Sequence, residues 1–349
     1  MTVELRPASI DEAQQLLKAE RRSIAFVGGG TEIGPLPAAL VVLHTGALNR
    51  IVEYAPSDQV VTVEAGVTLQ VLHAELSKHG QRLALDVPSE DRATLGGIVA
   101  AKSFGPRRTR YGSVRDLIIG VSILRADGTR AKGGGKVVKT VAGFDLPKLM
   151  CGSRGTLGMI ATVTFRVHPL PEHSVNVAAS ELPAAAVVDL VRKVRAAQLE
   201  PVAMLAVRGE RGWEVALRFE GFRAGVVQQR EKLPELEDAS DSLWATHLAS
   251  RGRVRFGALP TQLPQVEAAF QSAGDTSGSR PGSLCWYPTL GLGFAQTAEA
   301  RPALLALGGW MVDGTNFGPP PSSLPLHRAM KARLDPEGRL APGTFVGGI

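Results

Sequence analysis

Three glycine-rich segments are the residues of this chain best suited to bind an anion. They are Val27–Thr31 (Val-Gly-Gly-Gly-Thr), Ala93–Gly97 (Ala-Thr-Leu-Gly-Gly) and Gly152–Gly158 (Gly-Ser-Arg-Gly-Thr-Leu-Gly). Glycine lets the backbone approach a ligand closely and adopt positive φ at little steric cost, and successive N–H groups in such turns form a concavity that suits an anion. Each loop alone could be a tight surface turn. Together they predict one long ligand with a phosphate part, held along its length.

The loops do not match the common nucleotide-binding fingerprints. Ile33 stands where the last glycine of G-x-G-x-x-G belongs, Pro35 follows Gly34 where a P-loop needs lysine, and Val137 follows Lys136. The sequence therefore supports neither a Rossmann fold nor a P-loop NTPase. It also contains no H-E-x-x-H, no paired His/Cys spacing for zinc and no G-x-S-x-G, so we expect no metal site and no hydrolase elbow.

Composition and charge narrow the possible partners. The chain has 349 residues, 44% of them hydrophobic and 21% charged, which is a globular balance long enough for two domains. The net charge of +6 attracts anions, but the basic clusters Arg107–Arg110 and Lys132–Lys139 lie beside glycine loops, where a cofactor phosphate or an acidic partner explains them. Aromatic residues are only 5% and do not interleave with the basic runs, so we expect no nucleic-acid partner.

Cysteine content and hydropathy bear on redox chemistry and location. Cys151 and Cys285 are the only cysteines, too few for an iron–sulfur cluster, which needs about four thiolates. Glu4 and Arg6 interrupt the N-terminus, which therefore does not read as a signal peptide, and no stretch reaches the ~18 apolar residues of a membrane span. We expect a soluble, cytoplasmic protein.

Periodicity and turn signals predict an α+β chain in which the pattern changes at His168–Pro171. Before that point we expect helices over 9–22 (with Ser9 and Glu12 as a capping box), 68–80 and 145–151, a short helix begun by Thr94, and strands over 23–27, 40–43, 50–54, 59–64, 82–85, 117–125 and 159–167. After it we expect strands over 173–180, 202–208, 213–220, 253–258 and 283–287, and helices over 183–198, 223–232, 242–250, 262–273 and 324–334. Residues 275–282 read as a mobile loop.

The order of these motifs resembles one flavoprotein family. V-G-G-G-T-E, L-N-R-I-V-E-Y, V-T-V-E-A-G-V-T-L, A-T-L-G-G-I-V-A-A, R-Y-G-S-V-R-D-L-I-I-G and the run from Val138 to Ile160 follow one another as in the vanillyl-alcohol oxidase / p-cresol methylhydroxylase family. The resemblance is dense over 22–170, and a weaker tail match lies in Leu334–Gly338 and Ala341–Gly343. Within the family it points to the E-subunit branch of bacterial glycolate oxidases. It implies a two-part FAD-binding domain over 1–170, a smaller α+β cap domain with an antiparallel sheet over 171–323, and a C-terminal helix and tail over 324–349 that returns to the FAD domain.

The resemblance also assigns roles to residues. The first loop would cradle the FAD pyrophosphate, the second would approach the diphosphate and ribityl chain, Arg110 to Gly112 would lie near the flavin ring or ribityl chain, and the third loop would reach the adenine end, with Gly143 and Asp145 shaping a turn. The implied cofactor-binding residues are Gly28, Gly29, Gly30, Thr31, Glu32, Pro88, Thr94, Gly96, Gly97, Arg110, Tyr111, Gly112, Gly155, Gly158 and Ile160. Since His44, His73, His79 and Cys151 lie outside the positions that attach flavin covalently in relatives, we expect non-covalent FAD.

Catalytic residues are harder to assign. Arg154 stands where many relatives have a glutamate, and His247 and His327 are the only late histidines, where catalytic relatives have a histidine-rich motif. Oxidising a 2-hydroxy acid needs a cation for the carboxylate and a base for the hydroxyl proton. Arg218, Arg251, Arg253 and Arg255 could supply the cation, and His247 or His327 the base. His247 and Arg255 are the first candidates, although an exposed arginine or a lone histidine is more often structural.

The implied function is that of the FAD-binding subunit of a multi-subunit glycolate, or other 2-hydroxy acid, oxidase that converts glycolate to glyoxylate. Its partners would be a catalytic FAD subunit and an iron–sulfur subunit, which would supply the electron path that two cysteines cannot. Any contact of the chain with the inner membrane would be peripheral and made only through these partners. Two alternatives stay open: a self-sufficient FAD-dependent dehydrogenase of a small alcohol or sugar acid, and a flavin-free scaffold subunit. Turnover by the chain alone would favour the self-sufficient dehydrogenase, and a colourless protein would favour the flavin-free scaffold.

Overall fold

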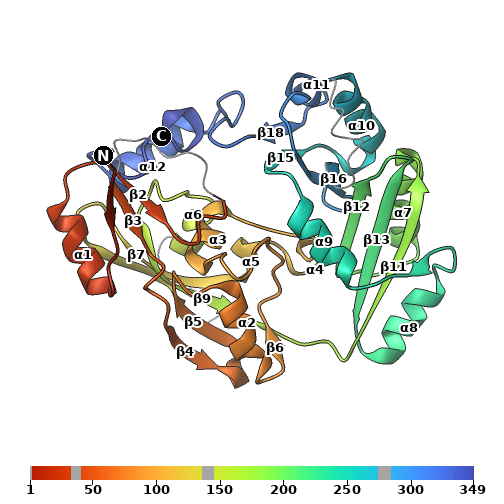
Figure 1. Ribbon diagram of the computed structural model, residues 1–349, viewed down its shortest axis with the longest axis horizontal. Helices are drawn as coiled ribbons and strands as arrows, with labels where there is room; N and C mark the ends of the chain where they lie inside the picture. Colours follow the sequence, from red (N-terminus) through yellow and green to blue (C-terminus); the bar gives the residue numbers. More distant parts are fainter. Residues whose placement is uncertain (1, 33–40, 136–144, 274–283) are drawn as a thin grey trace. The chain divides into compact units, whose positions relative to one another are not determined.

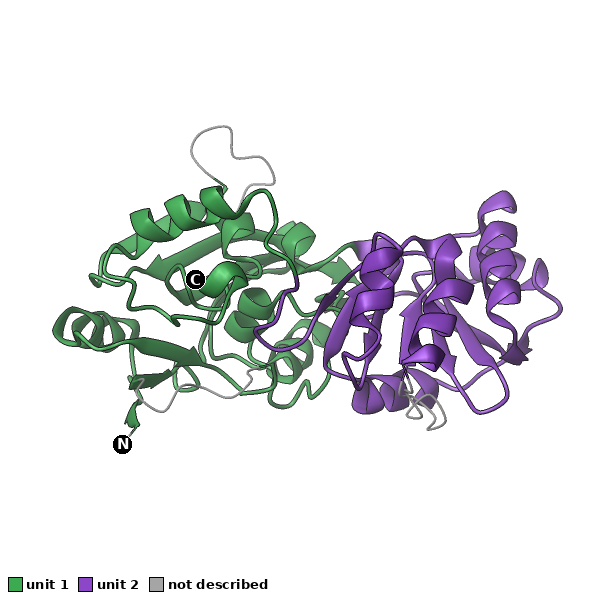
Figure 2. Cartoon of the chain, turned by 90° about the horizontal axis from the view of Figure 1, so that it is seen from above, with its two compact units in different colours: residues 1–104, 112–170, 319–349 green, residues 105–111, 171–318 purple. Residues whose placement is uncertain are grey.

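The structure, a computed structural model, describes residues 2–32, 41–135, 145–273 and 284–349, and the chain forms two compact units (Figure 2). The first unit comprises residues 1–104, 112–170 and 319–349, and the second comprises 105–111 and 171–318. The segment 105–111 thus belongs with the second unit, although it lies inside the stretch that the sequence assigned to the first domain. Gly143 and the predicted loop 275–282 lie outside the described residues.

The first unit contains a small parallel sheet and a larger antiparallel one (Figure 1). The parallel sheet has the order β1 (Val3–Leu5), β3 (Val41–His44), β2 (Ile24–Val27). The antiparallel sheet has the order β4 (Ile51–Ala55), β5 (Val60–Glu64), β9 (Met159–Arg166), β7 (Ile118–Leu124), β8 (Arg130–Gly134), and β6 (Gln81–Arg82) pairs with β10 (His168–Pro169). The helices are α1 (Ile10–Ala19), α2 (Leu69–Ser77), α3 (Leu95–Ala101), α5 (Val114–Leu117), α6 (Leu146–Met150) and α12 (Leu324–Leu334), with 3-10 turns η1 (Pro56–Asp58) and η4 (Val346–Gly348).

Helix caps in this unit follow the sequence signals. Ser9, Thr68, Thr94 and Asp145 each accept a hydrogen bond from a backbone N–H in the first turn of the helix that follows. The Ser9 box is not fully reciprocal, because the Glu12 carboxylate accepts from Ala8 N (2.8 Å). The amphipathic face of α2, namely Leu69, Leu72 and Leu76, packs into the core that also holds the inward residues of β5 and β9. These caps fix where α3 begins, and therefore where the second glycine loop lies.

Two predicted elements end earlier than expected. Helix α1 ends at Ala19 and not at Arg22, because the Glu20 carboxylate accepts the backbone N–H groups of Arg21 (2.9 Å) and Arg22 (2.8 Å). The strand expected over 82–85 is only Gln81–Arg82. Beyond it, Leu83 and Leu85 enter the core outside any strand, and the Leu83 carbonyl lies 2.9 Å from His73 Nε2.

The second unit is built on an eight-stranded antiparallel sheet with the order β14 (Glu237–Asp238), β11 (His173–Leu182), β13 (Trp213–Gly221), β12 (Ala203–Arg208), β16 (Leu284–Tyr287), β17 (Leu292–Ala295), β15 (Val254–Gly257), β18 (Trp310–Val312). Its helices are α4 (Arg108–Tyr111), α7 (Ala184–Ala196), α8 (Arg223–Glu231), α9 (Ser242–Ser250), α10 (Leu263–Ser272) and α11 (Arg301–Ala306), with a 3-10 turn η2 (Pro260–Gln262). An antiparallel sheet with helices was expected from the sequence. The sequence did not predict several short elements of the two units, namely β1, β10, β14, β17, β18, α4, α5 and α11.

The two faces of this sheet have different characters. Leu217 and Phe219 of β13 point into a core shared with α7, α8 and α10. Because side chains alternate along a strand, Arg218 and Glu220 point to the other face, where α9 and the segment 105–111 lie (Figure 1). Strand β13 therefore presents charged side chains on one face of the sheet and apolar core residues on the other.

Among the residues that the structure describes, no helix is long and apolar enough to cross a bilayer.

Candidate functional site

The first glycine loop leaves β2 and passes very close to the second loop. A Cβ atom added to Gly28 would lie 2.0 Å from Thr94 Oγ1, and one added to Gly29 would lie 1.7 Å from the Arg92 carbonyl oxygen. Arg92 Nη2 donates a hydrogen bond to the Gly29 carbonyl (3.2 Å). Gly28 and Gly29 are therefore required because two backbone segments about sixty residues apart in sequence touch here.

The N–H groups of this loop point to an anion cradle. Within the described residues, no hydrogen bond uses the backbone N–H of Gly28, Gly29 or Gly30. Gly30 adopts a φ of +68°, and a Cβ there would meet nothing within 4 Å. Consecutive unengaged N–H groups around a left-handed residue form the kind of concavity that receives a phosphate. Glu32, at the end of the loop, is held by a hydrogen bond from Ser103 Oγ (2.8 Å).

The second loop is built differently from the first. The N–H groups of Leu95 and Gly96 donate to the carbonyls of Val67 and Ala65 (both 2.8 Å), and Gly97 N donates to Thr94 Oγ1 (3.4 Å). A Cβ on Gly96 would lie 2.6 Å from that of Ala65. Because these donors are already engaged, this loop supports the first one more than it offers N–H groups of its own.

The third loop is held by backbone hydrogen bonds to the carboxyl end of α3. Gly152 N and Arg154 N donate to the carbonyls of Val99 and Ala100 (both 2.9 Å), while Arg154 and Gly155 have φ values of +51° and +79°. Ser153 is only 4% exposed, and its Oγ has no hydrogen-bond partner in the described part of the chain. A buried hydroxyl without a partner is unusual; a polar ligand atom at this position would satisfy it.

Lys331 connects the C-terminal tail to the third loop. Its Nζ donates to the carbonyls of Thr156 (2.8 Å) and Leu340 (2.6 Å) and pairs with Asp335 (2.7 Å). Burial lowers the pKa of Lys331, and the bond to Asp335 opposes that shift. The weak sequence match of the tail is therefore explained by packing against this loop.

The remaining predicted cofactor residues belong to several elements in both units. Arg110 and Tyr111 belong to the second unit, where exposed Arg110 pairs with Glu200 (3.2 Å). Gly112 belongs to the first unit with a φ of +77°, and Pro88 is half-buried there. Ile160 is a core residue of β9, so only its backbone could face a ligand. A Cβ added to Gly158 would lie 3.0 Å from the Leu124 carbonyl oxygen.

His247 lies in α9, on the sheet face of the second unit that also carries Arg218 and Glu220, and Arg255 lies in β15 of the same sheet (Figure 1). His247 is 3% exposed, and its Nε2 lies 3.1 Å from Tyr287 Oη. Burial, helped by Arg251, lowers the pKa of His247 to about 3, so the imidazole is neutral at pH 7 and a poor proton acceptor. His327 is on α12 in the first unit, beside Phe345.

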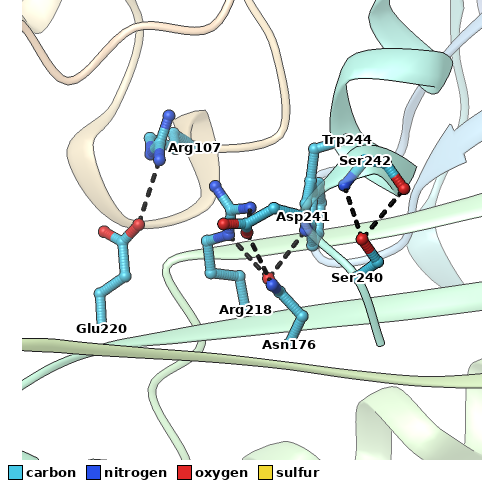
Figure 3. A network of polar contacts seen from close by, with 8 residues as sticks. All are labelled: Arg107, Asn176, Arg218, Glu220, Ser240, Asp241, Ser242 and Trp244. Atoms are coloured by element: carbon cyan, nitrogen blue, oxygen red, sulfur yellow. Dashed lines mark hydrogen bonds and ion pairs between the residues drawn. The ribbon is translucent and has the colours of Figure 1, made fainter. Parts of the chain in front are cut away.

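Arg218, one of the candidate cations, belongs to a polar network on that sheet face, and the rest of this network was not expected from the sequence (Figure 3). Arg107 Nη2 donates to Glu220 (3.1 Å), and Arg218 contacts both Asn176 and Asp241. One signal was available: Arg218 and Glu220 recur two residues apart in β13, alternating with the apolar residues Leu217 and Phe219, which marks a polar face on that strand. Among described residues, no three His, Cys, Asp or Glu side chains gather in a way that could hold a metal ion.

Known proteins match this arrangement. A family described as FAD binding domain matches residues 2–134. The chain is 31% identical to glycolate oxidase subunit GlcE of Escherichia coli (strain K12) over 351 residues, covering 96% of this chain and 93% of that protein. It is 35% identical to glycolate oxidase subunit GlcD of Bacillus subtilis (strain 168) over 176 residues, covering 48% of this chain and 37% of that protein.

Solved structures agree on the fold. An alkyldihydroxyacetonephosphate synthase superposes with a TM-score of 0.74 at 18% identity, covering 97% of this chain and 75% of that one. At that identity the likeness concerns the fold alone, an α+β arrangement of two units. The full-length similarity to GlcE, with the glycine loops in family order, gives the conclusion: the chain belongs to the FAD-linked oxidoreductase family of the vanillyl-alcohol oxidase / p-cresol methylhydroxylase type, and its cofactor is FAD.

Proposed function

We propose that this chain is the FAD-binding subunit of a multi-subunit oxidase that converts glycolate, or a closely related small 2-hydroxy acid, to the 2-oxo acid. The observation that carries the proposal is the similarity to GlcE over nearly the whole length of both proteins. The partners would be a catalytic FAD subunit, of the kind named GlcD among the relatives, and an iron–sulfur subunit.

The first unit suits the cofactor. The unengaged N–H groups of Gly28, Gly29 and Gly30 would bind the pyrophosphate of FAD, and Thr31 would continue that contact. Ser153 Oγ would gain the partner it lacks among the described residues. When bound, FAD supplies a two-electron acceptor for an alcohol carbon. Since neither Cys151 nor a histidine lies in the first loop, we propose that FAD is held without a covalent bond.

The second unit supports dependence on a partner. A histidine whose pKa is lowered to about 3 is a weak base at neutral pH; His247 has a tyrosine partner, and the Arg251 guanidinium near it lies over the Phe294 ring. Cys151 and Cys285 also have pKa values raised to about 12 by burial, which leaves both thiols protonated and unreactive. We infer that glycolate is oxidised efficiently only when the other subunits are present.

Co-expression tests this proposal. The chain would be produced alone and together with candidate catalytic and iron–sulfur subunits, and glycolate oxidation would be followed with an artificial electron acceptor. We expect flavin in the purified chain that acid precipitation releases entirely into the supernatant, little turnover by the chain alone, and turnover by the co-purified complex. Brisk turnover by the chain alone would show that it is a self-sufficient dehydrogenase, and a chain that never binds flavin would show that it is a scaffold.

A further inference from the structure

A pair of buried hydrogen-bond donors lies on the sheet face of the second unit that is turned away from the helical core. Asn176 of β11 and Arg218 of β13 are directly opposite each other in the antiparallel register. Asn176 Nδ2 (2.7 Å) and Arg218 Nη2 (2.5 Å) both donate to one oxygen, Oδ1 of Asp241 (Figure 3). Two donors that converge on one carboxylate oxygen form a carboxylate-binding geometry.

The donors are held in place without the help of Asp241. Arg218 Nε and Trp244 Nε1 both donate to Asn176 Oδ1 (2.8 Å each). This leaves the Asn176 amide only one orientation, with Nδ2 directed at Asp241. The guanidinium of Arg218 also lies over the Trp244 ring, 4.9 Å from its centroid. Removing the Asp241 carboxylate would therefore leave the two donors oriented.

The acceptor differs from the donors in its exposure. The Arg218 side chain is 11% exposed and Asn176 is 8% exposed, whereas the Asp241 side chain is 80% exposed. The two donors are part of the sheet, and Asp241 lies on the short connection between β14 and α9. Water therefore already reaches the carboxylate, and its release would expose little additional surface.

Asp241 precedes helix α9 directly, but its side chain does not cap that helix. It is the N-cap residue of α9, where aspartate ordinarily accepts a hydrogen bond from the first turn, yet its side chain makes no capping bond to that described helix. Ser240 Oγ accepts the Ser242 N–H (3.2 Å) instead. The carboxylate is directed at Arg218 and Asn176.

We propose that Arg218 and Asn176 bind the carboxylate of a small organic acid, and that Asp241 occupies this place when no such acid is present. The choice of glycolate as the acid rests on the proposed function; the site itself does not. Binding exchanges one carboxylate for another, so the number of ion pairs at Arg218 is unchanged. Because Asp241 is tethered at a high effective concentration, it weakens the apparent affinity for a free acid.

The test measures glycolate binding to the purified chain by calorimetry and by the fluorescence of Trp244, whose ring lies beside the site. We expect Asp241→Ala to bind glycolate about tenfold more tightly than the unmodified chain, because the competing carboxylate is gone. Asp189→Ala is the matched control: it removes an exposed aspartate that pairs with Arg192 (2.8 Å) on α7, and it should leave glycolate affinity unchanged. Glycolamide, which lacks the carboxylate, should not bind any of these proteins.

A second variant identifies the binding group. In the double variant Asp241→Ala, Arg218→Gln, glycolate affinity should fall at least tenfold below that of Asp241→Ala, with circular dichroism and melting confirming that the chain is folded. Equal affinity in Asp241→Ala and the unmodified chain, or binding that survives Arg218→Gln, would overturn the proposal. Flavin content, read from the absorbance of the same samples, reports on the proposed function separately, so that either idea can fail without the other.

Discussion

The first glycine loop and the polar network of the second unit are two ways of building a place for an anion. The loop offers backbone N–H groups, and its side chains matter mainly by being absent at Gly28 and Gly29. The network offers side chains, Arg218 and Asn176, which other side chains on the sheet hold in place. A backbone site depends on how closely two chain segments approach, whereas a side-chain site depends on which residues face one another across strands.

The same contrast separates neighbouring glycines. Gly29 approaches the Arg92 carbonyl so closely that any side chain must move the backbone, while Gly30 faces open space and needs glycine only for its φ of +68°. The two loops therefore form a contact that one methyl group is enough to disrupt. The effect of that methyl group should depend on which glycine carries it.

We expect Gly29→Ala to abolish flavin retention and to lower the free energy of unfolding by about 3 kcal/mol, because the new Cβ would lie 1.7 Å from the Arg92 oxygen. Gly30→Ala should cost about 1 kcal/mol, the usual penalty of a left-handed conformation for alanine. Urea unfolding and the flavin-to-protein absorbance ratio measure both effects. If the two variants lose stability equally, the close approach of the loops is not the reason for Gly29.

The glycine loops could be predicted from the sequence because their signals are local. The first loop directly follows β2, the second contains the cap Thr94 of α3, and the third directly precedes β9, so each loop adjoins an element that the sequence also indicates. The sequence therefore predicted the helices α2 and α3 and the order of the loops. It could not reveal that Gly28 and Gly29 touch Arg92 to Thr94, since that contact joins distant segments.

The network could not be predicted in the same way. Its members come from positions 107, 176, 218, 220, 241 and 244, and short spacings connect only 218 with 220 and 241 with 244, not these pairs with each other or with 107 and 176. His247 and Arg255 were singled out by residue type, but burial beside Tyr287 makes His247 a neutral structural residue. Asp241 would be expected to cap α9, and only the tertiary contact with Arg218 explains why it does not.

Two arginines in and beside the short helix α4 test how burial controls the strength of an ion pair in the second unit. The side chains of Arg107 and Glu220 are 19% and 3% exposed, whereas those of Arg110 and Glu200 are 51% and 63% exposed. Arg107→Ala should lower the free energy of unfolding by about 2 kcal/mol, because Glu220 would lose its ion-pair partner in a nearly dry position. Arg110→Ala should change it by less than about 0.5 kcal/mol.

Denaturant melts of the two variants at neutral pH and moderate salt decide the point. The double variant Arg107→Ala, Glu220→Gln should recover part of the lost stability, because the buried charge of Glu220 is then removed together with its partner. A further denaturant melt of this variant measures the recovery. An Arg110 variant as unstable as the Arg107 variant would mean that α4 is held by something other than this ion pair.

Two histidines, the buried His247 of the second unit and the half-buried His168 of the first, should make the protein sensitive to mild acid. Burial lowers the pKa of His247 to about 3, and burial with Arg166 and Arg82 lowers that of His168 to about 4, from an ordinary value of 6.5. Below pH 6.5 each of these histidines binds a proton in the unfolded chain but not in the folded chain. The free energy of unfolding therefore falls as the pH falls. For His247, lowering the pH from 6.5 to 5.5 should cost about 1 kcal/mol, because the unfolded imidazole is already half protonated at pH 6.5. His168 is less buried, and its contribution should be smaller because solvent screens it.

His247→Gln should flatten the pH dependence of urea unfolding between pH 6.5 and 5.5 more than His168→Gln does. A His247→Gln variant with the same slope as the unmodified chain would show that His247 takes up its proton without unfolding, and that the second unit is more open at Tyr287 than its packing indicates.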